Sequence, residues 1–255
     1  MRKREKFIIS STLLAIGLFA TQVLSIDIRP FAIALFTFAT YIMSAWALST
    51  NINGIEWITV LPFPTMYALA VSLFYFLLPE NFLSRIAVVG LFGIGMYALL
   101  LTSNIYAIGR VKTIQLLRAA HAVGSVFLLL MAIFFFNFIF SLQLHPLVNM
   151  LLSGLVTFPL MLCSTWSLEL EPKFTRRLYL VPLMFSFIIA QCALAISFLP
   201  VGLWSVSLFL TALLYVGFGL IQHYIEGRLF RRTTQEYLML AVFVTISFLL
   251  LIHWK

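Results

Sequence analysis

The sequence predicts an all-α fold, a polytopic transmembrane helical bundle of about nine spans that forms a single integral membrane domain over residues 1–255. Of its 255 residues, 63% are hydrophobic and only 9% are charged, whereas soluble proteins carry about 25% charged residues. The apolar residues fall into nine runs close to the ~20 residues that a helix needs to cross a ~30 Å hydrocarbon core. Because lipid offers no hydrogen bonds to an open strand, these runs are expected to be helices.

The first apolar run, residues 7–26, follows the basic segment Met1 to Lys6. This arrangement resembles a secretory signal, but the run is longer than the 7–15 residues typical of a signal core. No small-x-small cleavage site follows it. We therefore interpret it as a retained first span.

The other spans are bounded by charged residues or by short turns. Arg29, Glu56, Arg85 and Arg118 each precede one of the next four runs, and all 16 basic and 8 acidic residues lie at or beyond a run's end. The last run is the shortest and the weakest of the nine. The eight further spans are predicted at residues 30–50, 57–78, 86–103, 119–142, 146–167, 178–198, 203–223 and 237–253.

The basic residues predict the orientation, because lysine and arginine near span ends remain cytoplasmic. With the N-terminus inside and the C-terminus outside, thirteen of the 16 basic residues lie on the cytoplasmic side. Only Arg29, Arg85 and Lys255 lie outside. The cytoplasmic set is Arg2, Lys3, Arg4, Lys6, Arg110, Lys112, Arg118, Lys173, Arg176, Arg177, Arg228, Arg231 and Arg232.

A candidate polar pocket comes from residues that lipid does not favour. Pro62 and Pro64 fall in one span, remove backbone donors and are expected to bend or break that helix, a device of transporters. Gln191 and Asn137 lie within spans and should face the bundle interior, with Ser186 close to Gln191 in sequence. The alternative is an ordinary kink together with simple interhelical hydrogen bonds.

Two predicted cytoplasmic connectors share the pattern acid-x-base-x-x-Arg-Arg, at residues 171–177 and 226–232. One interpretation is a duplicated hairpin that presents two equivalent sites for lipid headgroups. The alternative is that any cytoplasmic loop gathers basic residues. The candidate headgroup residues are Arg176, Arg177, Arg231 and Arg232.

Other kinds of site are disfavoured. No metal-ligand spacing appears, no nucleophile motif appears, and the four histidines lie singly at span boundaries, so no metal and no cofactor is expected. No acidic residue is expected to be buried within a span, which argues against a carboxylate proton relay. The glycines of residues 90–95 lie in an apolar helix, where close packing is expected. The net charge of +8 is assigned to topology and anionic lipid rather than to nucleic acid.

Four segments resemble an uncharacterised family of bacterial polytopic membrane proteins that carries a domain of unknown function. They are residues 44–48 (Ser-Ala-Trp-Ala-Leu), 54–57 (Gly-Ile-Glu-Trp), 113–121 (Thr-Ile-Gln-Leu-Leu-Arg-Ala-Ala-His) and 228–233 (Arg-Leu-Phe-Arg-Arg-Thr). The resemblance implies a location in the bacterial cytoplasmic membrane over nearly the full length. It implies no activity.

Three functional hypotheses remain. The first is a scaffold or accessory subunit that acts through contacts with membrane lipids and with other membrane proteins. The second is a permease or lipid transporter with the polar pocket above. The third is an enzyme on lipid-linked substrates, for which Glu169, Glu171 and Glu226 are the candidate bases.

Overall fold

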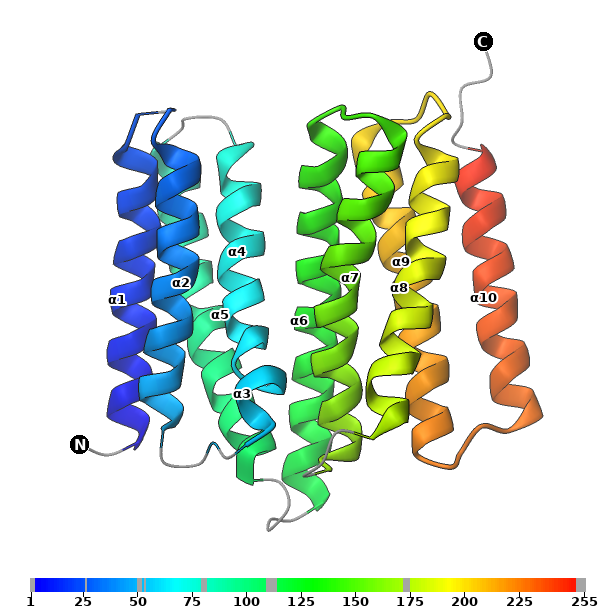
Figure 1. The fold of residues 1–255 in the computed structure, drawn as a ribbon, viewed down its shortest axis with the longest axis horizontal. Helices are drawn as coiled ribbons and strands as arrows, with labels where there is room; N and C mark the ends of the chain where they lie inside the picture. Colours follow the sequence, from blue (N-terminus) through cyan, green and yellow to red (C-terminus); the bar gives the residue numbers. More distant parts are fainter. Residues whose placement is uncertain are drawn as a thin grey trace. The chain divides into compact units, whose positions relative to one another are not determined.

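The computed structural model describes residues 3–25, 27–49, 52, 54–78, 82–108, 114–171 and 175–250, and within these ranges the regular structure is entirely helical (Figure 1). The predictions for Arg2, Arg110, Lys112, Lys173 and Lys255 lie outside the described residues, as does the end of the predicted last span.

Each predicted span overlaps a helix over most of its length, except that residues 57–78 overlap two helices. The helices are α1 Lys3–Val23, α2 Arg29–Leu48, α3 Glu56–Thr59, α4 Pro62–Phe76, α5 Phe82–Ile108, α6 Ile114–Ser141, α7 Pro146–Glu169, α8 Arg176–Ile196, α9 Leu203–Ile225 and α10 Arg231–Leu250.

Eight helical stretches among the described residues are long and apolar enough to cross a membrane, with α3 and α4 counted together as Glu56–Phe76. The all-α prediction is therefore confirmed. Helix α1 is not among the eight. Its first turn holds Lys3, Arg4, Glu5 and Lys6, and these four charged residues leave a shorter apolar portion.

Some helix ends differ from the predicted span ends. Helix α5 extends beyond residues 86–103 at both ends, and α10 begins six residues before residue 237. Backbone hydrogen bonding does not stop where side chains become polar. Charged residues such as Arg85 and Arg231 therefore begin or extend helices beyond the apolar run.

The chain divides into two units, Met1–Phe127 and Leu128–Lys255. In unit 1, α1 packs on α2 and α5, while α4 packs on α2 and α5, which makes a four-helix bundle. Glycine permits the close approach of some of these helices. A Cβ atom at Gly95 would meet the side chain of Tyr67, and one at Gly93 would lie 3.4 Å from the Cβ atom of Ala15. The expected glycine packing of α5 is thus present at two positions.

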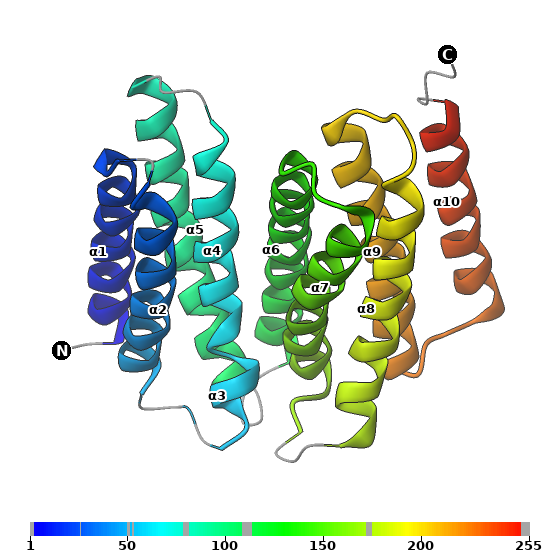
Figure 2. The same cartoon turned by 45° about the horizontal axis from the view of Figure 1, so that its top comes forward.

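In unit 2, α7 and α8 form the most extensive helix pair, α9 packs on both, and α10 packs on α9. Successive helices α7 to α10 run in alternating directions, as the two views show (Figures 1 and 2). Only Phe248 of α10 is buried, where its ring lies 4.3 Å from that of Phe209. Helix α10 therefore lies at the edge of the unit.

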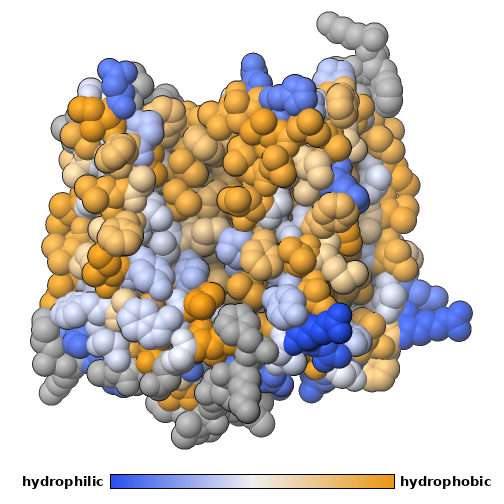
Figure 3. Space-filling model, in the orientation of Figure 1, coloured by the Kyte–Doolittle hydropathy of each residue, from blue (hydrophilic) through white to orange (hydrophobic). Residues whose placement is uncertain are grey.

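The outer surface of the helices is strongly apolar. Phe31, Leu83 and Leu250 are each at least 80% exposed, and apolar residues cover most of the face seen in Figure 3, with the strongly hydrophilic residues mainly near the helix ends. Soluble monomers rarely expose contiguous apolar patches larger than a few hundred Å². Such a surface is suited to lipid.

Candidate functional site

The predicted interruption at the two prolines is present in unit 1. Helix α3 ends at Thr59 and α4 begins at Pro62. Because proline has no N–H, neither Pro62 nor Pro64 can donate the hydrogen bond that would continue one helix through this point. Their predicted part in a polar pocket stays a prediction, since the other three candidate residues belong to unit 2.

Those three residues lie in different environments. Gln191 is exposed, contrary to the expectation that it faces the bundle interior. Asn137 is buried, with 5% of its surface exposed, and among the described residues its Nδ2 atom has no hydrogen-bond partner. Ser186 donates a hydrogen bond of 2.8 Å to the backbone oxygen of Leu183 and lines a groove.

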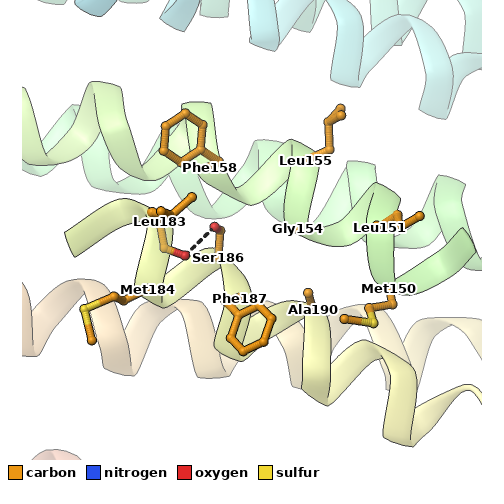
Figure 4. Close-up of a pocket in the computed structure, with 10 residues that line it drawn as sticks. All are labelled: Met150, Leu151, Gly154, Leu155, Phe158, Leu183, Met184, Ser186, Phe187 and Ala190. Atoms are coloured by element: carbon orange, nitrogen blue, oxygen red, sulfur yellow. Dashed lines mark hydrogen bonds between the residues drawn. The ribbon is translucent and has the colours of Figure 1, made fainter. Parts of the chain in front are cut away.

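The groove lies between α7 and α8 and has a volume of about 670 Å³ (Figure 4). A Cβ atom at Gly154 would lie 3.2 Å from the Cβ atom of Ala190, so small residues bring the two backbones together there. Leu155 and Met184 are 70% and 66% exposed, which leaves the groove open at the surface. Its lining is Met150, Leu151, Gly154, Leu155, Phe158, Leu183, Met184, Ser186, Phe187 and Ala190.

The buried face of α7 carries a polar stripe that the sequence reasoning missed. Asn149, Ser153 and Thr157 follow at intervals of four residues and are at most 4% exposed, so they share one side of the helix. The Asn149 Nδ2 atom donates to the Ser197 Oγ atom at 3.2 Å, and the Thr157 hydroxyl donates to the backbone oxygen of Ser153 at 2.7 Å. The four-residue spacing was the signal that would have revealed the stripe.

Helix α9 adds a matching pair of hydroxyl groups, Ser207 and Thr211, which are buried. Helices α7 and α9 begin at the same end of unit 2. At a rise of 1.5 Å per residue, the distance along the helix axis from these starts is about 4 to 12 Å for Asn149, Ser153, Ser207 and Thr211. We call these four residues the polar layer. Three of its atoms, Asn149 Oδ1, Ser153 Oγ and Thr211 Oγ1, have no hydrogen-bond partner within the described part of the chain.

The four candidate headgroup arginines are all exposed and occupy the first two positions of α8 and α10. Arg177 donates to the Tyr224 hydroxyl at 2.9 Å, and its guanidinium lies 4.9 Å from the centre of that ring. Arg232 pairs with Glu236 at 3.3 Å. Each pair of arginines thus contains one member with a partner inside the protein.

The model of the family described as Protein of unknown function (DUF5656) matches residues 31–251. The chain belongs to this family. No curated protein and no solved structure matches it. The matched region of this DUF5656 protein covers α2 to α10 and includes the groove, the polar layer and the four arginines, whereas α1 precedes it. The resemblance to an uncharacterised family is confirmed.

Among the described residues of the DUF5656 protein, Glu56 and Arg29 are charged and buried at helix ends, which the sequence did not predict. Glu56 is the first residue of the stretch Glu56–Phe76, so it lies at a span end as predicted, but it is only 3% exposed and is therefore covered by the protein itself. Its short helix α3 packs on α4, and hydropathy does not reveal that contact. Arg29 is 8% exposed and donates to the backbone oxygens of Leu24 and Gln22, each at 3.3 Å.

The carboxylates considered for an enzyme lie near the helix ends around the arginines. Glu171 accepts a hydrogen bond from the Thr175 hydroxyl, and Glu226 accepts one from Gln222 at 3.0 Å. Within the ranges that the structure describes, no group of three or more histidine, cysteine, aspartate or glutamate residues is arranged to hold a metal ion.

Proposed function

We propose that this DUF5656 protein is a multi-pass protein of the bacterial cytoplasmic membrane that acts as a scaffold or accessory subunit through contacts with helices and lipids. It has nine spans, a cytoplasmic N-terminus and a C-terminus outside. The observation that carries the proposal is the chemistry of the surface. The long helices present apolar side chains outward, and the groove between α7 and α8 has a single side-chain hydroxyl in its lining.

Helix α1 is the proposed span that adds to the other eight, and its packing supports the proposal that it crosses the membrane. It lies against α2 and α5, both of which are long and apolar enough to cross. Phe7, Leu14 and Leu18 are almost fully buried, while Ile8 and Ile16 are more than half exposed. A helix with one face in the bundle and the other apolar face outward is suited to crossing beside its neighbours.

The orientation rests on where basic residues gather in unit 2. In unit 2, the ends of α7 and α9 and the starts of α8 and α10 lie at one end, and Arg176, Arg177, Arg228, Arg231 and Arg232 all lie there. The positive-inside rule assigns that end to the cytoplasm.

The inner polar groups support contact rather than transport. Several hydroxyl groups donate back to the carbonyl four residues earlier, as in Thr40 to Phe36 at 2.8 Å and Ser72 to Ala68 at 2.6 Å. Such groups use their only donor within their own helix and have no proton left to donate to a polar substrate.

Helix α10 is the element best suited to a partner helix. Phe248 is its one buried residue, and its outward residues include Met239, Phe243 and Leu250, each more than 60% exposed. A helix held by one neighbour has a broad apolar face free for lipid or for another membrane protein.

The test places a photo-crosslinking amino acid at Phe243, with Leu91 of α5 as the matched control, since the two residues are 67% and 68% exposed. In intact membranes, the α10 position should give one discrete protein adduct, and the α5 position should give lipid adducts only. Lipid adducts alone at both positions would contradict the scaffold role.

The second candidate is a permease, and the polar layer is the observation that favours it. Buried atoms without partners in a membrane bundle are expensive and often mark a path for water or a polar ligand. The permease predicts that Ser153→Cys reacts with a membrane-impermeant thiol reagent from one side, whereas Leu160→Cys, on the same buried face, does not. Equal protection of both positions would exclude it.

A further inference from the structure

We propose that the groove between α7 and α8 binds one acyl chain of an anionic phospholipid whose phosphate is held by Arg176. The inference rests on the proposed membrane location and names the lipid and its site. Four features of unit 2 support it. They are the row of α8 residues that faces the groove, the length of that row, the apolar lining of the groove and the exposure of Arg176.

Arg176 lies on the same side of α8 as the groove residues of that helix. Leu183, Phe187 and Ala190 line the groove at intervals of four and three residues, the spacing of one helix face. Arg176 precedes Leu183 by seven residues and so lies within about 20° of it around the helix axis. Tyr179 lies near the same line and is 43% exposed.

The length of this line fits one phospholipid. From Arg176 to Ala190 the rise is about 21 Å at 1.5 Å per residue. Half of a bilayer, headgroups included, measures about 20–22 Å. A lipid with its phosphate at Arg176 would therefore carry its chain past Leu183 to the narrow place where Ala190 meets Gly154.

The chemistry of the groove suits a flexible hydrocarbon chain. Its one polar side chain, Ser186, already donates its hydroxyl proton to the Leu183 backbone oxygen. It therefore needs no hydrogen-bond acceptor from a molecule bound in the groove. Figure 4 shows Phe158 of α7 and Phe187 of α8 on opposite walls of the groove, both on the same side of the contact between Gly154 and Ala190. Met150 and Met184 add unbranched side chains, which adapt readily to irregular partners.

Arg176 is an exposed cation on α8, beyond the Leu183 end of the groove. It is the first residue of α8, where side chains tilt back toward the helix start and thus toward the headgroup region. Its neighbour Arg177 is directed to Tyr224. Guanidinium binds phosphate through two parallel hydrogen bonds, and the helix N-terminus adds partial positive charge.

The chain supplies a matched control for the headgroup. Arg231 is also exposed, is also the first residue of its helix and also opens an Arg-Arg pair. It begins α10, which packs on α9 and contributes no residue to the groove. A general attraction between arginine and anionic lipid would involve both residues equally, whereas the proposed site involves Arg176 alone.

The groove wall has a matched control as well. Phe187 lines the groove and Ile188 does not, although the two adjacent side chains are 55% and 51% exposed. Replacement of either by glutamine adds the same polar group at nearly the same depth. Only Phe187→Gln should weaken binding of the acyl chain.

The experiment uses native mass spectrometry of the full-length protein, purified in mild detergent and titrated with dioleoyl phosphatidylglycerol or dioleoyl phosphatidylcholine. The wild type should retain one molecule of the anionic lipid in preference to the zwitterionic one. Arg176→Gln should weaken binding of the anionic lipid about tenfold, as for loss of a charge-assisted hydrogen bond, while Arg231→Gln should leave it unchanged. Phe187→Gln should weaken both lipids several-fold, and Ile188→Gln neither.

The contrary outcomes are equally definite. Equal effects of Arg176→Gln and Arg231→Gln, or equal effects of Phe187→Gln and Ile188→Gln, would overturn the site. So would a dimer that Phe187→Gln dissociates, because a second copy would then occupy the groove. Circular dichroism and elution volume check that each variant is folded. Carbonate extraction of membranes tests the membrane location, and the crosslink at Phe243 tests the scaffold role, so failure of the lipid site is distinguishable from failure of either.

Discussion

Replacement of Gly154 by alanine tests whether the close contact of α7 and α8 holds unit 2 together. The added Cβ atom would lie 3.2 Å from the Cβ atom of Ala190 and 3.6 Å from the backbone oxygen of Ser186. The first distance is tighter than ordinary van der Waals contact, so the two helices must separate by a few tenths of an ångström. They are the most extensively packed pair in the unit.

The expected magnitude follows from two opposing effects. Overpacking of a well-packed contact costs about 1–3 kcal/mol, whereas glycine to alanine within a helix gains about 0.5–1 kcal/mol. The net prediction for Gly154→Ala is a loss of about 0–2.5 kcal/mol in the free energy of unfolding.

The matched control is Gly90→Ala. Gly90 also lies within a long helix, but a Cβ atom there would meet no atom within 4 Å. This variant should be neutral or more stable by up to about 1 kcal/mol. Unfolding in mixed detergent and SDS, followed by far-ultraviolet circular dichroism, measures both variants. If Gly154→Ala proves as stable as Gly90→Ala, close packing at Gly154 does not limit stability.

Three further predictions concern hydrogen bonding, hydration and topology. Tyr106→Phe removes the 2.8 Å hydrogen bond to the backbone oxygen of Ala120 and should destabilise unit 1 by about 0.5–1.5 kcal/mol in the same unfolding assay; no change would mean that the bond contributes nothing. Ser153→Ala should be neutral or stabilising if the Oγ atom is dry, and destabilising by about 1 kcal/mol if water or a ligand binds it. Alkaline phosphatase fused after Lys255 should be active, whereas the same enzyme fused to a chain truncated after Arg118 should be inactive. The reverse pattern would invert the proposed orientation.

The helices could be predicted from the sequence because hydropathy reports directly on the solvent that a segment requires. The rotation of each helix about its axis could not. Gln191 was expected to face inward because an amide is costly in lipid, yet it is exposed, since the neighbours of α8 fix which side is buried. Glu56 lies at the edge of an apolar run, and only the contact of α3 with α4 reveals its burial.

The candidate site was predictable in part. Ser186 was named and lines the groove, but hydropathy assigns the nine other lining residues to lipid or packing without distinction. A groove forms where the side chains of two helices do not fill the space between them. It therefore depends on how the two helices pack together and not on the hydropathy of either one. The stripe of Asn149, Ser153 and Thr157 was visible as a spacing of four residues, and only its complete burial separates it from an ordinary polar pattern.

The scaffold and the permease make opposite demands on that stripe. A dry, unpartnered hydroxyl costs about 1–3 kcal/mol, and a protein that acts only through its surface gains nothing from such a group. The Ser153 Oγ, Asn149 Oδ1 and Thr211 Oγ1 atoms lie about 4 to 12 Å from the helix starts, within reach of water entering from that end. If Ser153→Ala stabilises the protein, the layer is a tolerated defect and the scaffold remains the better account. If Ser153→Ala destabilises the protein, the layer is hydrated. The same three atoms would then be the first groups to bind water or a polar substrate along a path through the unit.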